Sequence, residues 1–325
     1  MIITDKLKYL SLFSGIGGFE LGIQQSNIAM ECVGYAEIDK YARSIYERQY
    51  PNHFNWGDVT QIRTDELPDF DLLVGGFPCQ AFSHAGLRRG FDDTRGTLFF
   101  EIARILKDKR PTYFLLENVR GLLHHDEGKT FKTILEVLSD LGYNVKWEVF
   151  NSKEFVPQRR ERIFIKGYIR GRCGERVLSF RGADSEINHK LDIPKNETVD
   201  NLCGNKEPLK IRETTKKGYK EAYPNDGVLL NRGNRKIAKG IVRKDHCGAL
   251  QTSGIWGTVD PNYKIRKLTP VECERLQGFP DDWTKYGVDD ELISNTQRYK
   301  CIGNAVTVPV ITFIINEMFG DLIEE

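Results

Sequence analysis

Short apolar runs alternate with longer amphipathic stretches over the first 170 residues of the chain. The short runs have the length of buried strands, and they occur at 9–13, 32–36, 72–74, 113–116, 145–150 and 162–168. The amphipathic stretches repeat their apolar residues at the period of a helix, and they occur at 19–25, 41–50, 98–109 and 131–141. Strands that alternate with helices predict an α/β fold with a mostly parallel, doubly wound sheet and helices on both faces.

The regular pattern is lost between about 170 and 264, where apolar runs become short and glycine and lysine are frequent. We expect this region to be a smaller, irregular, β-rich domain inserted into the sheet domain. Order returns at Thr269, which with Pro270 and Glu272 has the spacing of a helix N-terminal capping box. Gly142 is expected to be the C-terminal cap of the helix at 131–141, and a last helix is predicted at 309–319. The predicted domains are therefore 1–178 together with 294–325, and 179–293.

Composition is that of a globular protein, with 40% hydrophobic and 11% aromatic residues. We expect no signal peptide and no membrane span, and hence a cytoplasmic protein. The seven cysteines are an odd number, widely spaced and without a C-x-x-C pair. We therefore expect neither a disulfide framework nor a metal site.

Charge is unevenly distributed, although the net charge is only +1. Residues 151–267 contain 26 Lys and Arg against 14 Asp and Glu, an excess of +12, and the remainder carries −11. A basic segment of this kind indicates a face that binds a polyanion. An ordinary lysine-rich surface would have the same composition.

The most distinctive stretch is Gly75-Gly76-Phe77-Pro78-Cys79, directly after the run at 72–74. The glycines allow a turn and Pro78 stiffens it. Cys79 is thus expected on a rigid loop at the carboxyl end of a strand, where α/β sheets bind ligands. Such a cysteine is a candidate nucleophile. The alternative is a buried, inert thiol, which has no need of a stiffened turn.

A glycine-rich turn, Ser14 to Gly18, lies between the first strand and the first helix, and Glu37 follows about 20 residues later. This order is typical of a nucleoside-containing cofactor, with the acid on the ribose hydroxyls. Glu37 could equally be an acid at a helix N-terminus. Asp58 could accept from an amino group of the cofactor or be a turn residue.

Three charged residues are further candidates. Glu117 follows the strand at 113–116, which puts a carboxylate near the cysteine loop, although it could be a helix cap or an exposed acid. Arg160 and Arg162 would point the same way on an extended strand. They could hold a carboxylate or a phosphate, or form an exposed basic edge.

Together these segments resemble the DNA (cytosine-5)-methyltransferases in the layout of the compact bacterial modification enzymes. The matching segments are 11–19, 37–39, 57–59, 76–80, 95–99, 117–119, 158–162, 266–272 and 303–306. They cover both ends of the chain and leave out about 179–264, the variable target-recognition region in relatives. The sequence departs from the common family pattern at Ile38, where an aromatic residue is frequent, at Ala305, where serine is frequent, and at Ser11 and Ser14.

The resemblance implies a fold of the S-adenosylmethionine-dependent methyltransferase type and a chemistry for each motif. Cys79 would add to C6 of a cytosine, Glu117 would act as an acid at N3, and Arg160 and Arg162 would orient the base and Glu117. The cofactor would be S-adenosylmethionine, which leaves as S-adenosylhomocysteine. Its implied contacts are Phe13, Gly15, Gly17, Gly18, Glu37, Ile38, Asp58, Val59, Pro78, Leu98, Asn304 and Ala305.

The implied partner is duplex DNA with a specific short sequence, from which the target base is flipped out. Contacts with DNA are implied for Gln80, Ser83, Arg95, Arg243, Gln251 and Thr252. We expect a monomer and, by the resemblance, a role in restriction-modification or epigenetic marking with a possible cognate endonuclease.

Three other functions were weighed. An RNA (tRNA) cytosine-5-methyltransferase would use the same scaffold and chemistry, but the long basic insert favours duplex DNA. A nicotinamide-dependent oxidoreductase would account for the glycine turn and Glu37, but not for the cysteine loop or Gln158-Arg159-Arg160-Glu161-Arg162. A catalytically dead DNA-binding relative would not need Cys79, Glu117 and both arginines.

Overall fold

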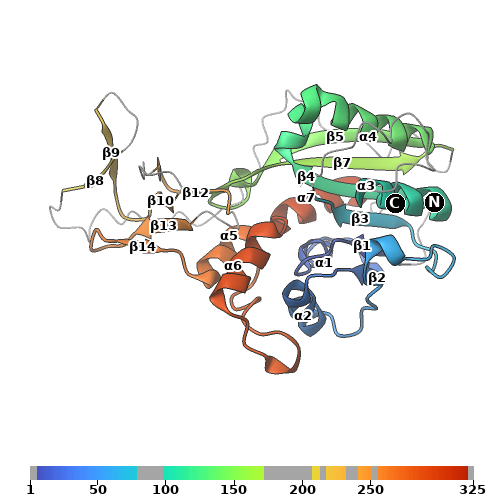
Figure 1. Cartoon of the computed structure of the whole chain (residues 1–325), viewed down its shortest axis with the longest axis horizontal. Coiled ribbons are helices and arrows are strands. Elements are labelled where there is room, and N and C mark those ends of the chain that lie inside the picture. The colour runs from blue at the N-terminus through green and yellow to red at the C-terminus, as the bar shows by residue number, and fades with distance from the viewer. Residues whose placement is uncertain are drawn as a thin grey trace.

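The structure is a computed structural model of the whole chain (Figure 1). It describes residues 6–78, 98–171, 207–212, 217–231, 241–250 and 255–320. The predicted site residues Cys79, Gln80, Ser83, Arg95, Gln251 and Thr252 lie outside these ranges.

A six-stranded sheet forms the larger part of the molecule, with the order β2-β1-β3-β4-β7-β5. Its strands are β1 (Leu7–Leu12), β2 (Met30–Ala36), β3 (Leu72–Gly76), β4 (Tyr113–Val119), β5 (Tyr143–Asn151) and β7 (Glu161–Ile169). The first four are parallel to one another, and β7 is antiparallel to both β4 and β5. The mostly parallel, doubly wound sheet is therefore confirmed. Strand order reverses between β1 and β3, which is where such sheets bind ligands.

Two pairs of helices cover the two faces of this sheet, because successive side chains of a strand point to opposite sides. Leu72 and Val74 pack with α1 (Gly18–Gln24) and α7 (Val308–Phe319). Leu73 packs on the other face with α3 (Leu98–Lys109) and α4 (Lys129–Asp140). As predicted, Gly142 follows α4 in the left-handed conformation, at φ +94°.

A third apolar cluster joins the start of the chain to its end. It combines Ala42 and Ile45 of α2 (Lys40–Gln49) with α5 (Pro270–Gln277) and α6 (Asn295–Asn304). The predicted capping box of α5 is present: Glu272 N–H donates to Thr269 Oγ1, and Thr269 N–H donates to the Glu272 carboxylate. Short 3-10 helices lie at Val59–Gln61, Arg120–Gly128, Ser152–Glu154 and Val288–Asp290.

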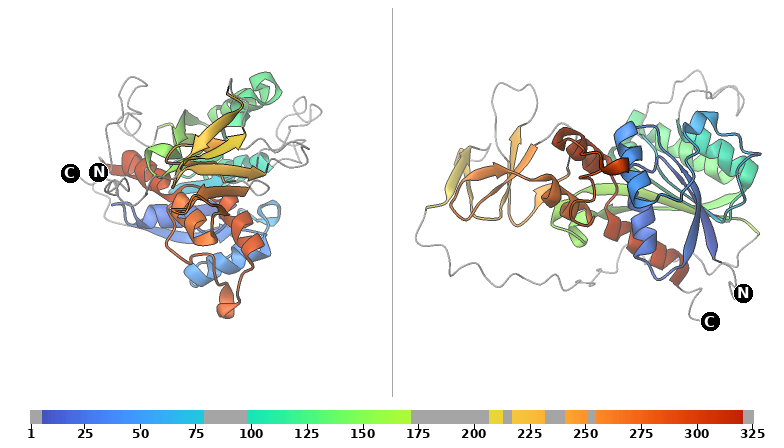
Figure 2. Two further views of the ribbon diagram at one scale, coloured as in Figure 1. Left: turned by 90° about the vertical axis from the view of Figure 1, so that its left-hand side faces the viewer. Right: turned by 90° about the horizontal axis from the view of Figure 1, so that it is seen from below.

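The region of lost periodicity forms small β-sheets, as expected. One sheet has the order β11-β10-β13-β14, and two further pairs are β8 with β9 and β12 with β6. Their bounds are β6 (Gln158–Arg159), β8 (Leu209–Arg212), β9 (Tyr219–Ala222), β10 (Gly227–Asn231), β11 (Val242–Arg243), β12 (Cys247–Gly248), β13 (Ile255–Val259) and β14 (Ile265–Lys267). Figures 1 and 2 show these sheets at one end of an elongated molecule, with α5 and α6 between them and the large sheet.

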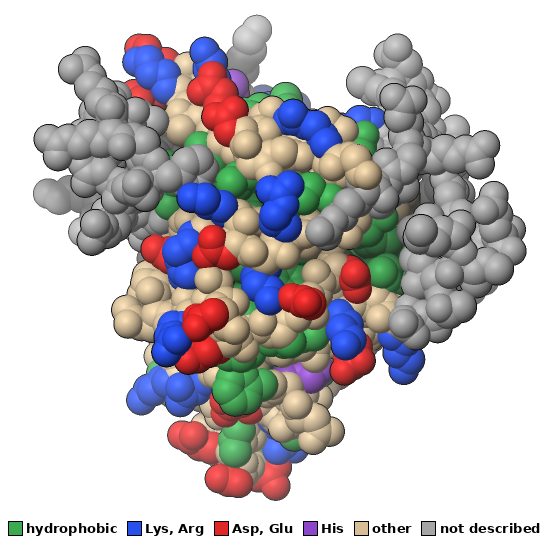
Figure 3. All heavy atoms as spheres, turned by 90° about the vertical axis from the view of Figure 1, so that its right-hand side faces the viewer, with side chains coloured by type: hydrophobic (Ala, Val, Ile, Leu, Met, Phe, Trp, Pro, Cys, Tyr) green, Lys and Arg blue, Asp and Glu red, His purple; other side chains and the backbone are tan. Residues whose placement is uncertain are grey.

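The end of the molecule opposite the small sheets carries acidic and basic side chains in alternation (Figure 3). The visible face there shows no broad area of one charge sign.

One stretch, Asn295–Phe319, is apolar and long enough by composition to cross a membrane. It is weak evidence for a span, because a buried core helix passes the same test. Here the backbone breaks after Asn304 into α6 and α7, and α7 packs against the sheet.

Among the described residues there is no cluster of His, Cys, Asp and Glu that could hold a metal ion, and Cys32, Cys247, Cys273 and Cys301 are free. Burial raises the pKa of each of these four thiols to about 12. None of the four is therefore suited to form a thiolate near neutral pH.

Candidate active site

The glycine-rich turn leaves the carboxyl end of β1 in a strained path that needs glycine. Gly15 and Gly17 have φ angles of +58° and +87°, which residues with a side chain rarely adopt. The Gly15 N–H donates to Glu37 Oε2 at 2.9 Å, so the end of β2 supports the turn that follows β1. The other Glu37 oxygen accepts from the N–H groups of Ile38 and Asp39.

The surroundings of this turn fit a nucleoside. A Cβ placed on Gly15 or on Gly57 would meet no atom within 4 Å, so both glycines face open space. Ile38, beside the Glu37 carboxylate, is 69% exposed. The Glu37 carboxylate is suited to accept from the hydroxyls of a ribose. The exposed Ile38 side chain beside it is suited to contact the base.

Glu117 lies inside β4, since this strand continues three residues beyond the predicted end at Leu116. Its register partner on β3 is Gly76, just ahead of Phe77 and Pro78. Arg162 on β7 donates from Nε to Glu117 Oε1 at 2.8 Å. A Cβ on Gly76 would come within 3.2 Å of Glu117 Oε2, so glycine leaves the room that this carboxyl occupies. The structure thus brings Glu117, Arg162 and the start of the cysteine loop together.

The pKa of Glu117 is raised above its ordinary value, because burial disfavours the carboxylate more than its two neighbouring arginines favour it. Arg162 and, more remotely, Arg160 oppose the shift. A buried carboxyl that keeps its proton can donate it to a bound base.

Asn118 was not singled out from the sequence. Its Nδ2 donates to the Phe77 carbonyl at 2.9 Å, and the side chain is buried. This bond ties the first residues of the cysteine loop to the strand that carries Glu117. The signal in the sequence that could have identified Asn118 is its polar side chain at the end of an apolar strand.

Arg160 has different partners from Arg162. Its guanidinium is 2% exposed and donates to the carbonyls of Leu250, Gly303 and Ala305 at 2.9–3.2 Å. Burial lowers its pKa to about 9. Arg160 therefore joins β7 to the break between α6 and α7 and to the segment just before Gln251.

Two buried glutamines extend this junction: Gln158, which begins the motif at 158–162, and Gln277, which the sequence did not mark. Gln158 accepts from Leu250 N–H and donates to the Leu276 carbonyl. Gln277 donates to the carbonyls of Ile302 and Ala305 and accepts from Thr307 Oγ1. Both glutamines are completely buried. Their place between the domains has no local sequence signal.

The remaining predicted cofactor residues lie around the same edge of the sheet with different exposure. Phe13 and Leu98 are half-buried against the core, Val59 and Ala305 are buried, and Pro78, Asp58 and Asn304 are exposed. Asp58 Oδ1 accepts from the N–H and the hydroxyl of Thr60, so it caps the 3-10 turn at Val59–Gln61. Gly18 is pressed against Val306 and Phe279.

Arg243, the one predicted DNA contact within the described ranges, lies on β11 in the four-stranded small sheet. It is half-buried. The sheet that carries it is separate from the six-stranded sheet that carries Glu117, and it lies in the part of the chain that is rich in Lys and Arg.

Comparison with known proteins gives the same assignment as the geometry. Residues 7–320 match the family described as C-5 cytosine-specific DNA methylase. The type II methyltransferase M1.ScrFI of Lactococcus lactis subsp. cremoris is 39% identical and aligns with 97% of this chain and 78% of its own. The type II methyltransferase M.SsoII of Shigella sonnei is 37% identical, with 98% and 82% covered.

Among solved structures, the Entamoeba histolytica methyltransferase EhMeth has a TM-score of 0.64 at 20% identity, covering 98% of this chain and 99% of its own. This likeness supports the fold. The chain belongs to the C-5 cytosine-specific DNA methylase family and is a DNA cytosine methyltransferase. The family does not favour the RNA alternative, and it argues against the oxidoreductase.

Proposed function

We propose that this enzyme methylates C5 of cytosine in a specific duplex sequence through a covalent adduct between Cys79 and C6. The observation that carries the proposal is the contact of Arg162 with the buried Glu117, the register partner of Gly76, immediately before the cysteine loop. A buried carboxyl whose pKa is raised, beside the strand that leads to a candidate thiol, matches the needs of this reaction, because C5 of cytosine is a poor nucleophile until a nucleophile adds at C6.

The residues around the glycine turn would hold S-adenosylmethionine, whose sulfonium supplies the methyl group. Glu37 would accept from the ribose hydroxyls, Phe13 and Ile38 would contact the adenine, and Asp58 would accept from its amino group. Pro78, Leu98, Val59, Asn304 and Ala305 would complete the site. The open space at Gly15 and Gly57 and the exposure of Ile38 support this assignment.

Addition at C6 and the proton transfers at N3 each have a group in this chain. The Cys79 thiolate adds to C6 while Glu117 gives its proton to N3, which leaves C5 electron-rich. Arg162 holds the Glu117 carboxyl and balances its charge after transfer. After methyl transfer, loss of the C5 proton expels the thiolate from C6, and the N3 proton returns to Glu117. Water is the candidate acceptor of the C5 proton.

The substrate is expected to be flipped out of the duplex, because a paired base hides C6 from a thiol. The basic region would contact phosphates and supply nonspecific affinity, and Gln80, Ser83, Arg95, Arg243, Gln251 and Thr252 are the candidate contacts. We propose a cytoplasmic monomer that acts in restriction-modification alongside a cognate endonuclease. The type II relatives support that role.

The test uses duplex DNA of mixed sequence containing 5-fluorocytosine, with S-adenosylmethionine. Fluorine at C5 blocks the last elimination, so a cysteine that attacks C6 stays attached to the DNA. We expect a denaturation-resistant complex with the wild-type enzyme and none with Cys79→Ser. Cys32→Ser is the matched control and should still give the complex.

Mapping the trapped cytosines would identify the target sequence. A complex that persists in Cys79→Ser would contradict the assigned nucleophile. Methyl transfer to RNA without any complex on DNA would replace the substrate with the RNA alternative.

A further inference from the structure

A segment from the far end of the chain contacts the glycine turn. The Trp283 indole N–H donates to the Ile16 carbonyl at 2.9 Å, a bond between residues 267 positions apart. Ile16 is 1% exposed and lies between Gly15 and Gly17, the two residues with positive φ. The Ile16 carbonyl thus has a fixed partner at the most strained point of the turn.

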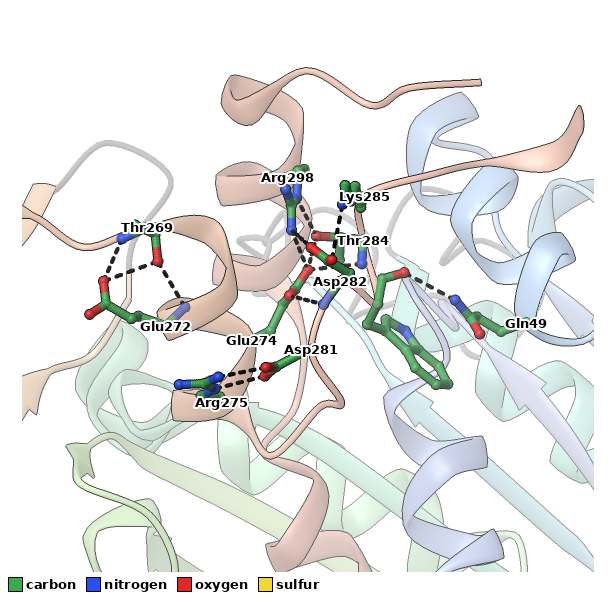
Figure 4. A network of polar contacts seen from close by, with 11 residues as sticks. Gln49, Thr269, Glu272, Glu274, Arg275, Asp281, Asp282, Thr284, Lys285 and Arg298 are labelled. Carbon is green, nitrogen blue, oxygen red and sulfur yellow. Dashed lines mark hydrogen bonds and ion pairs between the residues drawn. The ribbon is translucent and has the colours of Figure 1, made fainter. Parts of the chain in front are cut away.

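Trp283 itself is fixed by a buried carboxylate. Glu274 on α5 is fully buried, and it accepts from the N–H groups of Asp282 and Thr284, both at 2.9 Å. These two residues flank Trp283 directly. The backbone on either side of the tryptophan is therefore held by one side chain (Figure 4).

An arginine neutralises that carboxylate. Arg298 on α6 donates from Nη2 to Glu274 at 2.9 Å and from Nε to Thr284 Oγ1 at 3.0 Å. It is 8% exposed, so the pair is shielded from water. A buried charge pair with its other hydrogen bonds satisfied holds one geometry, and loss of one partner is costly.

Further contacts orient the tryptophan from the opposite side. The Trp283 carbonyl accepts from Gln49 Nε2 at 3.0 Å, and the ring packs near Tyr50 and Phe279. Phe279 also lies against Gly18, where a Cβ would come within 3.3 Å of its ring. Two aromatic residues of this segment thus contact the turn.

We propose that Trp283 is a positioning residue for the cofactor turn, held in place by Glu274 and Arg298. Glu37 supports the turn at Gly15 N–H and Trp283 supports it at the Ile16 carbonyl, so the turn is fixed from both sides. The proposal rests on the proposed binding of S-adenosylmethionine at this turn. It assigns to the segment after α5 a part in cofactor affinity rather than in DNA recognition.

The test compares Trp283→Phe with the wild type. Phenylalanine keeps the ring packing and removes the N–H group. Trp256→Phe is the matched control, since it removes a similar N–H bond, to the Ala249 carbonyl, within the small sheets. Binding of S-adenosylmethionine is measured by calorimetry without DNA, and exchange of the Gly15 and Gly17 amides is measured without any ligand.

We expect Trp283→Phe to raise the cofactor Kd by about 5- to 10-fold, the factor for one hydrogen bond. The two amides should exchange faster by a similar factor, and KM for DNA should change less than twofold. Trp256→Phe should leave the cofactor Kd and both amides unchanged. Glu274→Gln should shift Kd and exchange in the same direction as Trp283→Phe.

Unchanged exchange in a folded Trp283→Phe variant would overturn the proposal, as would an equal loss of cofactor and DNA affinity. If the wild type does not bind S-adenosylmethionine, the proposed cofactor is wrong. In that case the exchange of the Gly15 and Gly17 amides still tests whether Trp283 holds the turn, because it is measured without any ligand.

Discussion

Two arginines that are two residues apart in the chain contact different parts of the molecule. Arg162 contacts the Glu117 carboxylate, whereas Arg160 contacts three carbonyls at the junction of β7 with α6, α7 and the segment before Gln251. Neighbouring positions in one motif therefore have different surroundings, a buried carboxyl for Arg162 and backbone carbonyls for Arg160. We expect replacement of Arg162 to affect turnover and replacement of Arg160 to affect stability.

The Glu117→Gln variant tests whether Glu117 acts as the acid at N3 of the cytosine. Glutamine keeps an acceptor for Arg162 but cannot give a proton to N3, so we expect kcat to fall by about 10²–10⁴-fold. In the wild type, kcat should decrease as pH rises through the raised pKa of Glu117, because the neutral carboxyl is the donor. Single-turnover methylation at several pH values measures both effects.

The control is Glu136→Gln, which changes an exposed ion pair and should leave kcat unchanged. A Glu117→Gln variant with wild-type kcat would contradict the assigned role.

Glu20 is a buried acid outside the proposed chemistry. It is fully buried in α1, accepts from the Tyr46 hydroxyl at 3.1 Å, and lies near Tyr9, Cys32 and Tyr50. Burial raises its pKa from 4.5 to about 7. The unfolded carboxyl therefore ionises first as pH rises, and stability is lost between about pH 4.5 and 7.

Glu20→Gln removes this ionisation. Relative to the wild type, the variant should gain stability on going from pH 5 to pH 8, by on the order of 3 kcal/mol if the whole shift is recovered. Urea unfolding at both pH values measures the difference. A difference in the free energy of unfolding that does not change with pH would show that the folded protein keeps Glu20 at an ordinary pKa.

At the scale of elements, the first and last helices described in the structure pack closely against each other. A Cβ on Gly22 of α1 would come within 2.5 Å of Ile311 Cβ on α7. Alanine normally stabilises a helix relative to glycine, by about 1 kcal/mol. Here the clash is with the branched carbon near the backbone of a packed helix, so steric overlap outweighs propensity.

We expect Gly22→Ala to destabilise the protein by about 1–3 kcal/mol, as overpacking of a core does. Gly320→Ala is the matched control, because its Cβ would meet nothing within 4 Å. Thermal unfolding of both variants gives the comparison. A Gly22→Ala variant as stable as Gly320→Ala would mean that α1 and α7 can separate at little cost.

The elements that local sequence signals specify were predicted well. The capping box at Thr269 and the left-handed Gly142 depend on neighbours within a few residues, and both are present. The strands at 9–13, 72–74 and 113–116 follow from apolar runs, and they form the centre of the sheet.

Contacts between residues that are far apart in the sequence could not be predicted from local signals. Insertion of β7 between β4 and β5 is decided by long-range packing, which no local pattern encodes. The same holds for Arg160 with Ala305, Gln158 with Leu250, and Trp283 with Ile16. The convergence of strand ends predicted that Glu117 lies beside the start of the cysteine loop, as it does, but the supporting contacts were not predictable.

At the scale of the whole molecule, the sequence concentrates Lys and Arg in residues 151–267, whereas the face opposite the small sheets mixes both signs. Release of counterions from DNA should therefore dominate nonspecific affinity and make it fall steeply with salt.

Arg243→Ala, on β11, should weaken binding to all duplexes alike and reduce the slope of log K against log salt by about one. Lys132→Ala, on α4 at the other end, should leave the slope unchanged. Fluorescence anisotropy at several salt concentrations measures it. A change in affinity for one DNA sequence only would instead indicate that Arg243 reads a base.

The position of α7 has a consequence for biosynthesis. Leu72, Val74 and Leu115 on one face of the sheet are covered by α7, which the ribosome makes after every strand of the molecule. The nascent chain must therefore carry this apolar face covered only by α1 while the small sheets are translated. Chains that stall before residue 308 keep the part of the face that α7 would cover exposed, and such intermediates are the ones that aggregate or need a chaperone.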